Sequence, residues 1–426
     1  MTERLALLGG TPVIGTPFPP YRSLGAEETA AANRVLETGV LSAYVGAPGS
    51  GFLGGPEVRA LEEEAQAYFG VAHAIAVNSW TSGLIAAIGA IAVEPGDEII
   101  VTPWTMAASA TAIVHWNAIP VFADIDPVSF NLDPAAVEAA ITPRTRAIMS
   151  VDIFGQSADM DRLRGIADKH GLKLLSDTAQ APGARYQGRY AGTLADIGGY
   201  SLNYHKHIHC GEGGILVTHD SRHAERLRLI RNHAEAVIQS EQPGELVNLI
   251  GYNFRLGEIE AAIARAQLHK LADKVASRQR AAAQLSRDLA GLAGFVPPRT
   301  SPGCTHVYYV YGMTLRLEEL PVDRARIFAA LRAEGVTGLG AGYQNVHRLP
   351  MFRHGIAYGR NGFPWRGLPG SVPARAPTQP CPVAERLHER EFLFLNVCAH
   401  EYTPAETDLV VAAFHKVWRN LESLRA

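Results

Sequence analysis

Short apolar runs alternate with helical repeats through the first part of the chain. Apolar runs bounded by turn residues predict strands at 74–77, 98–101, 121–122, 146–151 and 172–177. Apolar positions three or four residues apart predict helices at 27–37, 56–69, 83–92 and 161–170, and another that begins at 258. Strands that alternate with helices predict a mostly parallel central sheet with helices on both faces. The predicted fold class is therefore α/β.

The pattern changes in the C-terminal part, where the elements are fewer. A strand is predicted at 307–315, a helix at 322–334 and a closing helix at 403–424. We therefore predict an N-terminal arm at 1–25, a large domain at 26–275 and a smaller α+β domain at 276–426. Residues 348–380 are rich in Gly, Pro and Arg, which predicts a long loop that either carries function or wraps around a partner subunit.

Composition and charge narrow the class of partner. The 426 residues are 47% apolar and 19% charged, and the formal net charge of −3 shows no basic footprint for nucleic acid or an anionic membrane. No apolar run approaches the length of a membrane span, and the first residues lack the order of a signal peptide. The four Cys are scattered, which favours reduced thiols in a cytoplasmic protein.

The stretch 201–214 carries the strongest candidate chemistry. Lys206 lies among three His, and the turn Gly211-Glu212-Gly213-Gly214 follows it. Three Gly in four residues predict a tight turn that a ligand can approach closely. Burial and nearby cations would lower the pKa of this Lys and free its amine for Schiff-base chemistry. A surface Lys beside a hairpin is the alternative.

The alternating His205, His207 and His209 have two interpretations. On a strand they would share one side, where they could either bind a metal or line the surroundings of Lys206. No cluster of His and Glu in the sequence has convincing metal-type spacing. We favour the polar lining and predict no metal site.

Asp177 is the second candidate. It ends the apolar run 172–177, and open α/β sheets bind ligands at the carboxyl ends of their strands. Alone, this residue could also be the N-cap of the segment after it. Pyridoxal 5′-phosphate needs a Schiff-base Lys and an acid that faces its pyridine nitrogen, and Lys206 and Asp177 supply both.

The order of these residues resembles the DegT–StrS family. The motifs are Asp177-Thr178-Ala179-Gln180, then Ser201 five residues before Lys206, then the Gly-rich turn. The resemblance runs from about Pro19 to the C-terminal helix and implies a fold-type-I, pyridoxal phosphate-dependent aminotransferase with Lys206 and Asp177 as its catalytic pair. Such enzymes aminate keto-sugars, some of them nucleotide-linked, or keto-cyclitols, with L-glutamate or L-glutamine as donor. The resemblance also implies a homodimer with shared active sites.

The resemblance assigns further cofactor-binding roles. Thr81 and Ser82, joined by Ser201, match residues that hold the cofactor phosphate. Trp80 belongs to the same cofactor-binding set, at a position where the family usually has Gly. Gln180 would lie near the 3-oxygen of the cofactor. Asn253 would reach across the dimer interface to the cofactor phosphate of the partner subunit.

The residue that covers the cofactor ring departs from the family pattern. Met106 stands where family members have an aromatic ring, and Trp104 lies two residues earlier. A thioether can pack on a ring face, so either residue could cover the ring. Both assignments stay open.

The residues predicted to contact the substrate are Tyr44, His205, His207, Arg255 and His347. Tyr44 lies in a loop rich in Gly and Ser at 39–55, and Arg255 matches an Arg in the family's Asn253 turn. The opening sequence Leu7-Leu8-Gly9-Gly10-Thr11-Pro12-Val13 is similar to the cyclitol and antibiotic-precursor branch of the family. This similarity favours a cyclitol acceptor only weakly, and a nucleotide-linked sugar stays open.

Two other functions are compatible with the same fold. Certain sugar 3-dehydratases of the family replace the Schiff-base Lys with His at the position of Lys206, and His207 matches their second His. The other alternative is a regulator that keeps pyridoxal phosphate for structure. An intact set of Lys206, Asp177 and Gln180 argues against that regulator.

Overall fold

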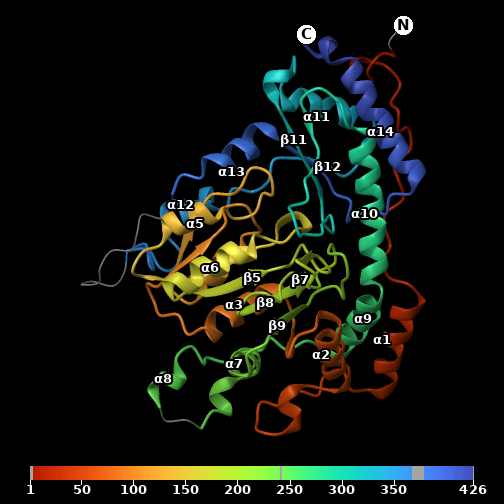
Figure 1. The fold of residues 1–426 in the computed structure, drawn as a ribbon. Coiled ribbons are helices and arrows are strands. Elements are labelled where there is room, and N and C mark those ends of the chain that lie inside the picture. The colour runs from red at the N-terminus through yellow and green to blue at the C-terminus, as the bar shows by residue number, and fades with distance from the viewer. Residues whose placement is uncertain (1–2, 240–241, 367–378, 426) are drawn as a thin grey trace.

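The computed structural model describes residues 3–239, 242–366 and 379–425, and it shows the predicted α/β fold (Figure 1). The large sheet has the strand order β1 (His73–Val77), β9 (Gly214–Thr218), β8 (Ile197–Ser201), β5 (Lys173–Asp177), β4 (Thr145–Val151), β2 (Glu98–Val101) and β3 (Ile119–Phe122). Strands from β8 to β3 pair in parallel, whereas β9 is antiparallel to both of its neighbours. The mostly parallel central sheet is confirmed.

Side chains of the large sheet alternate between two covered faces, as the period of a strand requires. One face is covered by α3 (Trp80–Ala90), α4 (Ala108–His115) and α7 (Ser221–Arg231). The other is covered by α2 (Pro56–Phe69), α5 (Pro134–Ala140), α6 (Met160–His170) and α9 (Glu258–His269). Burial on both faces explains why the strands are almost continuously apolar in sequence.

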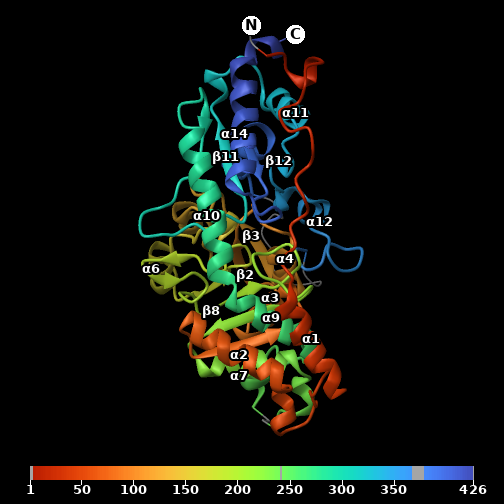
Figure 2. The same ribbon diagram turned by 90° about the vertical axis from the view of Figure 1, so that its right-hand side faces the viewer.

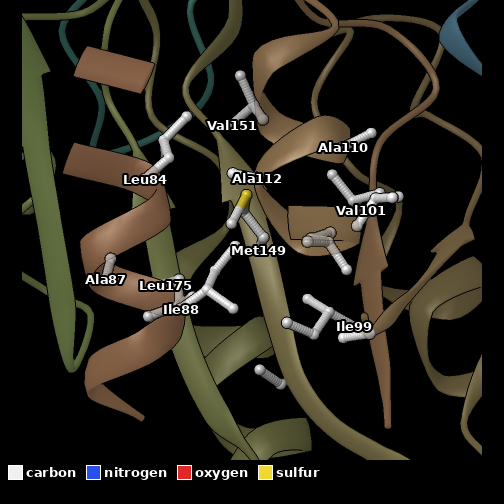
Figure 3. Packing of buried hydrophobic residues seen from close by; sticks show 14 of the residues in the cluster. Leu84, Ala87, Ile88, Ile99, Val101, Ala110, Ala112, Met149, Val151 and Leu175 are labelled. Atoms are coloured by element: carbon white, nitrogen blue, oxygen red, sulfur yellow. The ribbon is translucent and has the colours of Figure 1, made fainter. Parts of the chain in front are cut away.

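Helix α3 packs against the middle of the large sheet. Figure 3 shows Leu84, Ala87 and Ile88 of this helix directed toward Met149 of β4 and Leu175 of β5. All five side chains are buried in one apolar cluster. The first turn of the helix is thereby held beside the strand ends at which the candidate site lies.

The start of α3 corrects one prediction. The helix begins at Trp80, three residues before the predicted start at Gly83. Ser79 is the N-cap, and its Oγ accepts the N–H of Ser82 at 3.1 Å. Residues 79–82, which lie between the predicted strand and the predicted helix, are therefore the cap and the first turn of the helix.

The C-terminal part contains the predicted smaller α+β unit. Its antiparallel sheet has the order β10 (Phe295–Val296), β11 (Tyr311–Leu315), β13 (Phe392–Leu395) and β12 (Leu339–Ala341). The apolar core on this sheet is completed by α10 (Leu271–Asp288), α11 (Arg324–Ala333) and α14 (Pro404–Arg419). Helix α10 spans residue 276, and the domain boundaries stay a prediction.

Two further predictions for this part are corrected. Residues 307–310 are not part of a strand, because Val307 and Tyr309 donate their backbone N–H groups to Gly155 and Phe154 in the loop after β4. The predicted loop 348–380 contains α12 (Pro350–His354), and its residues 367–378 lie outside the described ranges. The remaining short elements are β6 (Arg185–Tyr186), β7 (Arg189–Tyr190), α8 (Pro243–Leu246) and α13 (Pro382–Arg386).

The N-terminal segment connects the two sheets. Leu5 and Ile14 are buried in the core of the C-terminal unit, and the buried Glu334 carboxylate accepts the backbone N–H groups of residues 6 and 13 at 2.8 and 3.0 Å. The red trace in Figures 1 and 2 then runs along the molecule to α1 (Ala26–Thr38). Helix α1 packs against α9, where Lys270 forms an ion pair with Glu28 at 2.7 Å.

Candidate active site

A cavity of about 160 Å³ lies at the carboxyl ends of β4, β5 and β8, beside the first turn of α3. Val151, Asp177 and Ser201, which end these three strands, all line it. Parallel neighbours end along one edge of a sheet, so residues far apart in sequence meet there. The predicted residues in the lining are Trp80, Thr81, Met106, Asp177, Gln180, Ser201, His205 and Lys206.

Three hydrogen bonds hold the Asp177 carboxylate. Trp80 Nε1 donates to Oδ1 at 2.7 Å, the backbone N–H of Ala179 donates to Oδ1 at 3.2 Å, and Ser109 Oγ donates to Oδ2 at 2.7 Å. Thr105 Oγ1 lies 2.9 Å from Ser109 Oγ and is left to donate to it. Donors on both oxygens stabilise the ionised carboxylate, which is the form that can pair with a protonated ring nitrogen.

The Trp80 indole reaches Asp177 through a space that three glycines leave open. Gly199 on β8 is the register partner of Asp177 on β5, and a Cβ there would lie 2.4 Å from Trp80 Cη2. A Cβ at Gly83 would lie 2.9 Å from Trp80 Cε3, and one at Gly214 would lie 3.0 Å from Trp80 Cα. A Cβ at Gly199 would also lie 2.2 Å from the backbone oxygen of Ile215, so this glycine makes room for the neighbouring strand as well as for the ring. Gly83 makes room for the ring, and Gly214 makes room for the backbone of Trp80.

Lys206 lies on the connection between β8 and β9, and its amine reaches the cavity. Burial lowers the pKa of Lys206 to about 8, although the negative charge of Asp177 acts in the opposite direction. The Nζ atom lies 4.6 Å from the centre of the Tyr309 ring and makes no hydrogen bond or ion pair with any described residue. An amine in this state is available as a nucleophile or base near neutral pH.

The three histidines around Lys206 have separate surroundings. His205 is largely exposed and lines the cavity, and partial desolvation with the charge of Lys206 lowers its pKa to about 4. His207 is buried, and its Nε2 bonds the carbonyl oxygen of Val307 at 2.8 Å. His209 Nε2 lies 2.5 Å from Ser23 Oγ. Across the ranges that the structure describes, no three His, Cys, Asp or Glu residues form a group suited to a metal ion.

The first turn of α3 fits a phosphate. The N–H groups at the start of a helix have no carbonyl partner within it, and they attract anions. The hydroxyl-bearing residues Ser79, Thr81 and Ser201 line the same cavity. This anion site, the amine of Lys206 and the fixed carboxylate of Asp177 match the phosphate, aldehyde and ring nitrogen of pyridoxal phosphate. The residues present therefore fit that cofactor.

The structure separates Met106 from Trp104. Met106 lines the cavity and is 62% exposed. Trp104 is fully buried among Phe130, Phe154 and Phe392, and its Nε1 has no hydrogen-bond partner among the described residues. Met106 is therefore the one of the two on the cavity wall, and its role over the ring stays a prediction.

Gln180 lines the cavity with both ends of its amide engaged. Its Oε1 accepts the N–H of Phe154 at 2.9 Å, and its Nε2 donates to Tyr343 Oη at 3.0 Å. These bonds fix the orientation of the amide. The predicted contact with the cofactor's 3-oxygen stays a prediction.

A second, larger cavity of about 460 Å³ adjoins the first, and Lys206 and His205 line both. Residues 21–24 of the N-terminal segment form part of its wall, together with Tyr204, His209 and Cys398. Of these wall residues, only His209 was predicted, as part of the polar lining around Lys206; the others, like Ser109 and Thr105 beside Asp177, were not among the predicted site residues. Only the three-dimensional arrangement brings the N-terminal segment next to Lys206.

Tyr44, Asn253 and Arg255 form a separate group. Arg255 Nε donates to Asn253 Oδ1 at 2.8 Å, and the Arg255 guanidinium lies 5.9 Å from the centre of the Tyr44 ring. Burial raises the pKa of Tyr44 to about 12. None of the three lines either cavity within this chain, as far as the described residues show. Their predicted contacts with cofactor and substrate stay predictions.

His347 also lies apart from both cavities. It is buried, and its Nε2 lies 2.8 Å from Glu385 Oε1. Its predicted contact with substrate stays a prediction.

Within the described ranges, no helix combines the length and the apolar character needed to cross a membrane.

Comparison with known sequences gives matches over most of the chain. The sequence model of the DegT/DnrJ/EryC1/StrS aminotransferase family matches residues 38–365. The chain is 36% identical to the L-glutamine:2-deoxy-scyllo-inosose aminotransferase of Streptoalloteichus tenebrarius, over 100% of both chains. It is 38% identical to the GDP-perosamine synthase of Caulobacter vibrioides, over 67% of this chain and 76% of that protein.

Solved structures match the whole fold. The X-ray structure of the aminotransferase from Psychrobacter cryohalolentis superposes with a TM-score of 0.80 at 29% identity, covering 95% of this chain and 100% of that chain. The structure of DesI in the presence of its TDP-sugar product superposes with a TM-score of 0.78 at 29% identity, covering 99% and 97%. Both comparisons therefore extend into the N-terminal segment and the small C-terminal sheet.

Proposed function

Because this chain belongs to the DegT/DnrJ/EryC1/StrS aminotransferase family, whose members depend on pyridoxal phosphate, we propose that it transfers an amino group from L-glutamine or L-glutamate to a keto-cyclitol or a keto-sugar. One observation carries the proposal. The unpaired amine of Lys206 lies where two cavities meet, on the same cavity wall as the fixed carboxylate of Asp177. The dehydratase alternative has no support, since the relatives named above are aminotransferases or act in amino-sugar synthesis.

The residues of this chain have separate roles in the proposed reaction, some in holding the cofactor and one in moving the proton. Pyridoxal phosphate, when bound, supplies an electron-accepting ring that stabilises negative charge on the α-carbon of the amino donor. Asp177 would hold the ring nitrogen, and the first turn of α3 with Thr81 and Ser201 would hold the phosphate. In the first half-reaction the neutral Lys206 Nζ would accept the proton from the donor's α-carbon and pass it to the cofactor carbon that keeps the amino group. In the second half-reaction it would move a proton from that carbon to the acceptor's former keto carbon.

The pKa of Lys206 suits this proton transfer. A base works best when its pKa lies near the working pH, because it is then both free to accept a proton and able to release it. Burial brings the pKa of this amine to about 8, below the ordinary value of 10.5. His205, whose pKa is lowered to about 4, stays neutral beside it and adds no competing charge.

The larger cavity is the proposed site of the acceptor. Its wall carries hydroxyl, imidazole and guanidinium groups from Tyr21, Arg22, Ser23, Tyr204 and His209, which suit a ring with several hydroxyl groups. We favour a keto-cyclitol, because the relative that acts on 2-deoxy-scyllo-inosose aligns over the entire chain, including the segment that forms this wall. A nucleotide-linked keto-sugar is the second acceptor to test, because of the similarity to GDP-perosamine synthase.

A homodimer with shared sites is part of the proposal. Met106 and Tyr204 are 62% and 69% exposed at the cavities, and exposed apolar groups around a binding site suit a covering partner. Asn253 and Arg255 would then serve the partner's site. Mixing an Asn253→Ala protein with a Lys206→Ala protein tests this. If sites are shared, each mixed dimer has one intact site of two and about half the wild-type activity, so a randomly paired mixture recovers about a quarter; unshared sites restore none.

The location proposed for the protein is the cytoplasm. All four Cys are free thiols in the structure, and three of them are buried. Free thiols persist in a reducing compartment. Cell fractionation of the source organism would test this location.

The activity itself is tested by visible spectroscopy. The purified protein with pyridoxal phosphate is scanned before and after addition of L-glutamine or L-glutamate, and then with 2-deoxy-scyllo-inosose or a nucleotide-linked keto-sugar. We expect the band of the bound cofactor to disappear with the donor and to return with the correct acceptor. A band that no amino donor changes would contradict the aminotransferase proposal.

A further inference from the structure

Trp80 is the feature of the cofactor site that the family resemblance leaves unexplained, because the family usually has Gly at this position. We infer that Trp80 is a positioning residue whose indole N–H orients the Asp177 carboxylate and leaves one acceptor position, on Oδ2, for the ring nitrogen of the cofactor. The inference rests on the cofactor site of the proposed function and not on the identity of donor or acceptor.

The hydrogen bonds of Asp177 fix the orientation of its carboxylate. A carboxylate has about four acceptor positions, two on each oxygen. Among the described residues, Trp80 and Ala179 occupy both positions on Oδ1, and Ser109 occupies one on Oδ2. Rotation of the carboxylate would break the two bonds on Oδ1 and the one on Oδ2 together. The remaining position on Oδ2 is therefore fixed in direction.

The packing around the indole carries the second step. Trp80 is the first residue of α3 and is 7% exposed. Its ring crosses β8 at Gly199, the residue paired with Asp177 across the sheet. A Cβ at Gly199 would lie 2.2 Å from the backbone oxygen of Ile215 on β9 and 2.4 Å from Trp80 Cη2. The close approach of the neighbouring strand already requires a glycine there, and the indole fills the space that the missing side chain leaves.

The indole N–H of Trp80 differs from those of the other buried tryptophans in its hydrogen-bond partner. Trp104 is fully buried near the same cavity, but its Nε1 has no hydrogen-bond partner among the described residues. Trp116 of the same core donates its Nε1–H to the neutral carbonyl oxygen of Ile85 at 2.7 Å, so the other buried indoles in the described part of this core have either a backbone partner or none. Trp80 Nε1 instead lies 2.7 Å from a charged oxygen, and a hydrogen bond to a charged group is among the stronger ones.

The test compares Trp80→Phe with Trp104→Phe as the matched control. Both changes remove one indole N–H from a buried ring, but only the first removes a hydrogen bond to Asp177. Apoprotein of each variant is titrated with pyridoxal phosphate, and the half-reaction with L-glutamine and L-glutamate is then followed. We expect Trp80→Phe to weaken cofactor binding several-fold and to lower kcat roughly tenfold, with KM for the donor changed less than twofold. Trp104→Phe should leave all three values within about twofold of the wild type.

A double-mutant cycle separates positioning from packing. If Trp80 acts through Asp177, adding Trp80→Phe to Asp177→Asn should change cofactor affinity and kcat by less than about twofold. Equal losses in the wild-type and Asp177→Asn backgrounds would overturn the inference, as would a Trp80→Phe protein indistinguishable from Trp104→Phe. The affinity measurement needs no amino donor, so it decides the inference even if the proposed aminotransfer fails.

A measurement that keeps Trp80 in place tests the inference even if the Trp80→Phe protein does not fold. The chain has five Trp, and ¹⁵N labelling of their indoles gives five N–H resonances. We expect a single indole resonance to shift strongly when Asp177→Asn is introduced and when pyridoxal phosphate is added. If no indole resonance responds to either change, the hydrogen bond does not position the carboxylate and the inference is wrong.

Discussion

Asp177 and Lys206 line the same cavity, but their surroundings are opposite. The Asp177 carboxylate accepts three hydrogen bonds, two of them at 2.7 Å, so its position is fixed. The Lys206 amine makes no hydrogen bond or ion pair with a described residue, and burial lowers its pKa to about 8. One group therefore supplies a charge that stays in place, and the other supplies a proton acceptor that moves. Aminotransfer needs both groups. Asp177 would keep the positive charge on the cofactor's ring nitrogen, while Lys206 moves a proton from one carbon atom to another.

Removal of the mobile group should have the largest effect. Lys206→Ala should lower the rate of aminotransfer at least about a thousandfold, because it removes the buried amine that accepts and passes on the proton in the proposed reaction. The rate is measured under single-turnover conditions with L-glutamine. The control is Lys173→Ala, an exposed Lys at the start of β5 on the far side of the sheet, which should keep full activity. A Lys206→Ala protein within tenfold of the wild type would show that another group performs the transfer.

Neutralising Asp177, the fixed group, should lower the rate less than removing the amine of Lys206. Asp177→Asn keeps the shape of the side chain but removes its charge, so kcat should fall roughly a hundredfold. Steady-state kinetics with each amino donor measures the loss. Asp168→Asn, which removes a surface carboxylate on α6, is the control and should change kcat less than twofold. An unchanged kcat in Asp177→Asn would mean that the ring nitrogen needs no anionic partner here.

The pH dependence of cofactor capture tests the mobile group without an amino donor. Only the neutral amine attacks an aldehyde, and the pKa of the free Lys206 amine is about 8. The rate at which apoprotein captures pyridoxal phosphate should therefore rise about tenfold per pH unit below 8 and level off above it. Stopped-flow absorbance measures this rate. A rate that keeps rising to pH 10 would show that the amine retains its ordinary pKa.

The smallest effect is expected at His205, which lies beside Lys206 but is neither the fixed charge nor the proton acceptor. Its pKa is lowered to about 4, so it carries no charge between pH 5 and 8. His205→Gln should therefore leave the shape of the pH–rate profile unchanged and alter KM for the acceptor only a few-fold, through lost polar contact. A profile whose acid limb moves in this variant would assign His205 a role in proton transfer.

The same comparison shows how far the sequence could lead. Asp177 and Lys206 were predictable because each lies next to a strong local signal, the end of an apolar strand and a Gly-rich turn. Five strands of the sheet were predictable because burial on both faces keeps them largely apolar. Strand β8 was not predicted, since its sequence Ile-Gly-Gly-Tyr-Ser has no such run. Ser109, which holds the other oxygen of Asp177, has no local signal, since any Ser near a helix start is first of all a candidate cap.

The role of Trp80 required distances that no sequence pattern contains. The sequence marked this residue as a departure from the family, but not that Gly199, more than a hundred positions later, leaves room for its ring. The choice between Met106 and Trp104 was open for a similar reason. Both lie in a segment without helical or strand periodicity, so only the packing of the aromatic cluster decides that Trp104 points away from the cavity.

The N-terminal segment acts mechanically as a strap of fixed length. One end is fastened to the C-terminal unit, where the backbone N–H of Ile14 bonds the carbonyl of Glu334 at 2.9 Å. The other end is fastened near Lys206, where Tyr21 Oη accepts from Lys274 at 2.7 Å and the carbonyl of Ser23 accepts from Gln267 at 3.0 Å. Six residues lie between Ile14 and Tyr21, and the seven steps from one to the other span at most about 25 Å when the chain is fully extended. The strap therefore sets an upper limit on how far the two sheets can move apart, and with it the widest opening of the acceptor cavity.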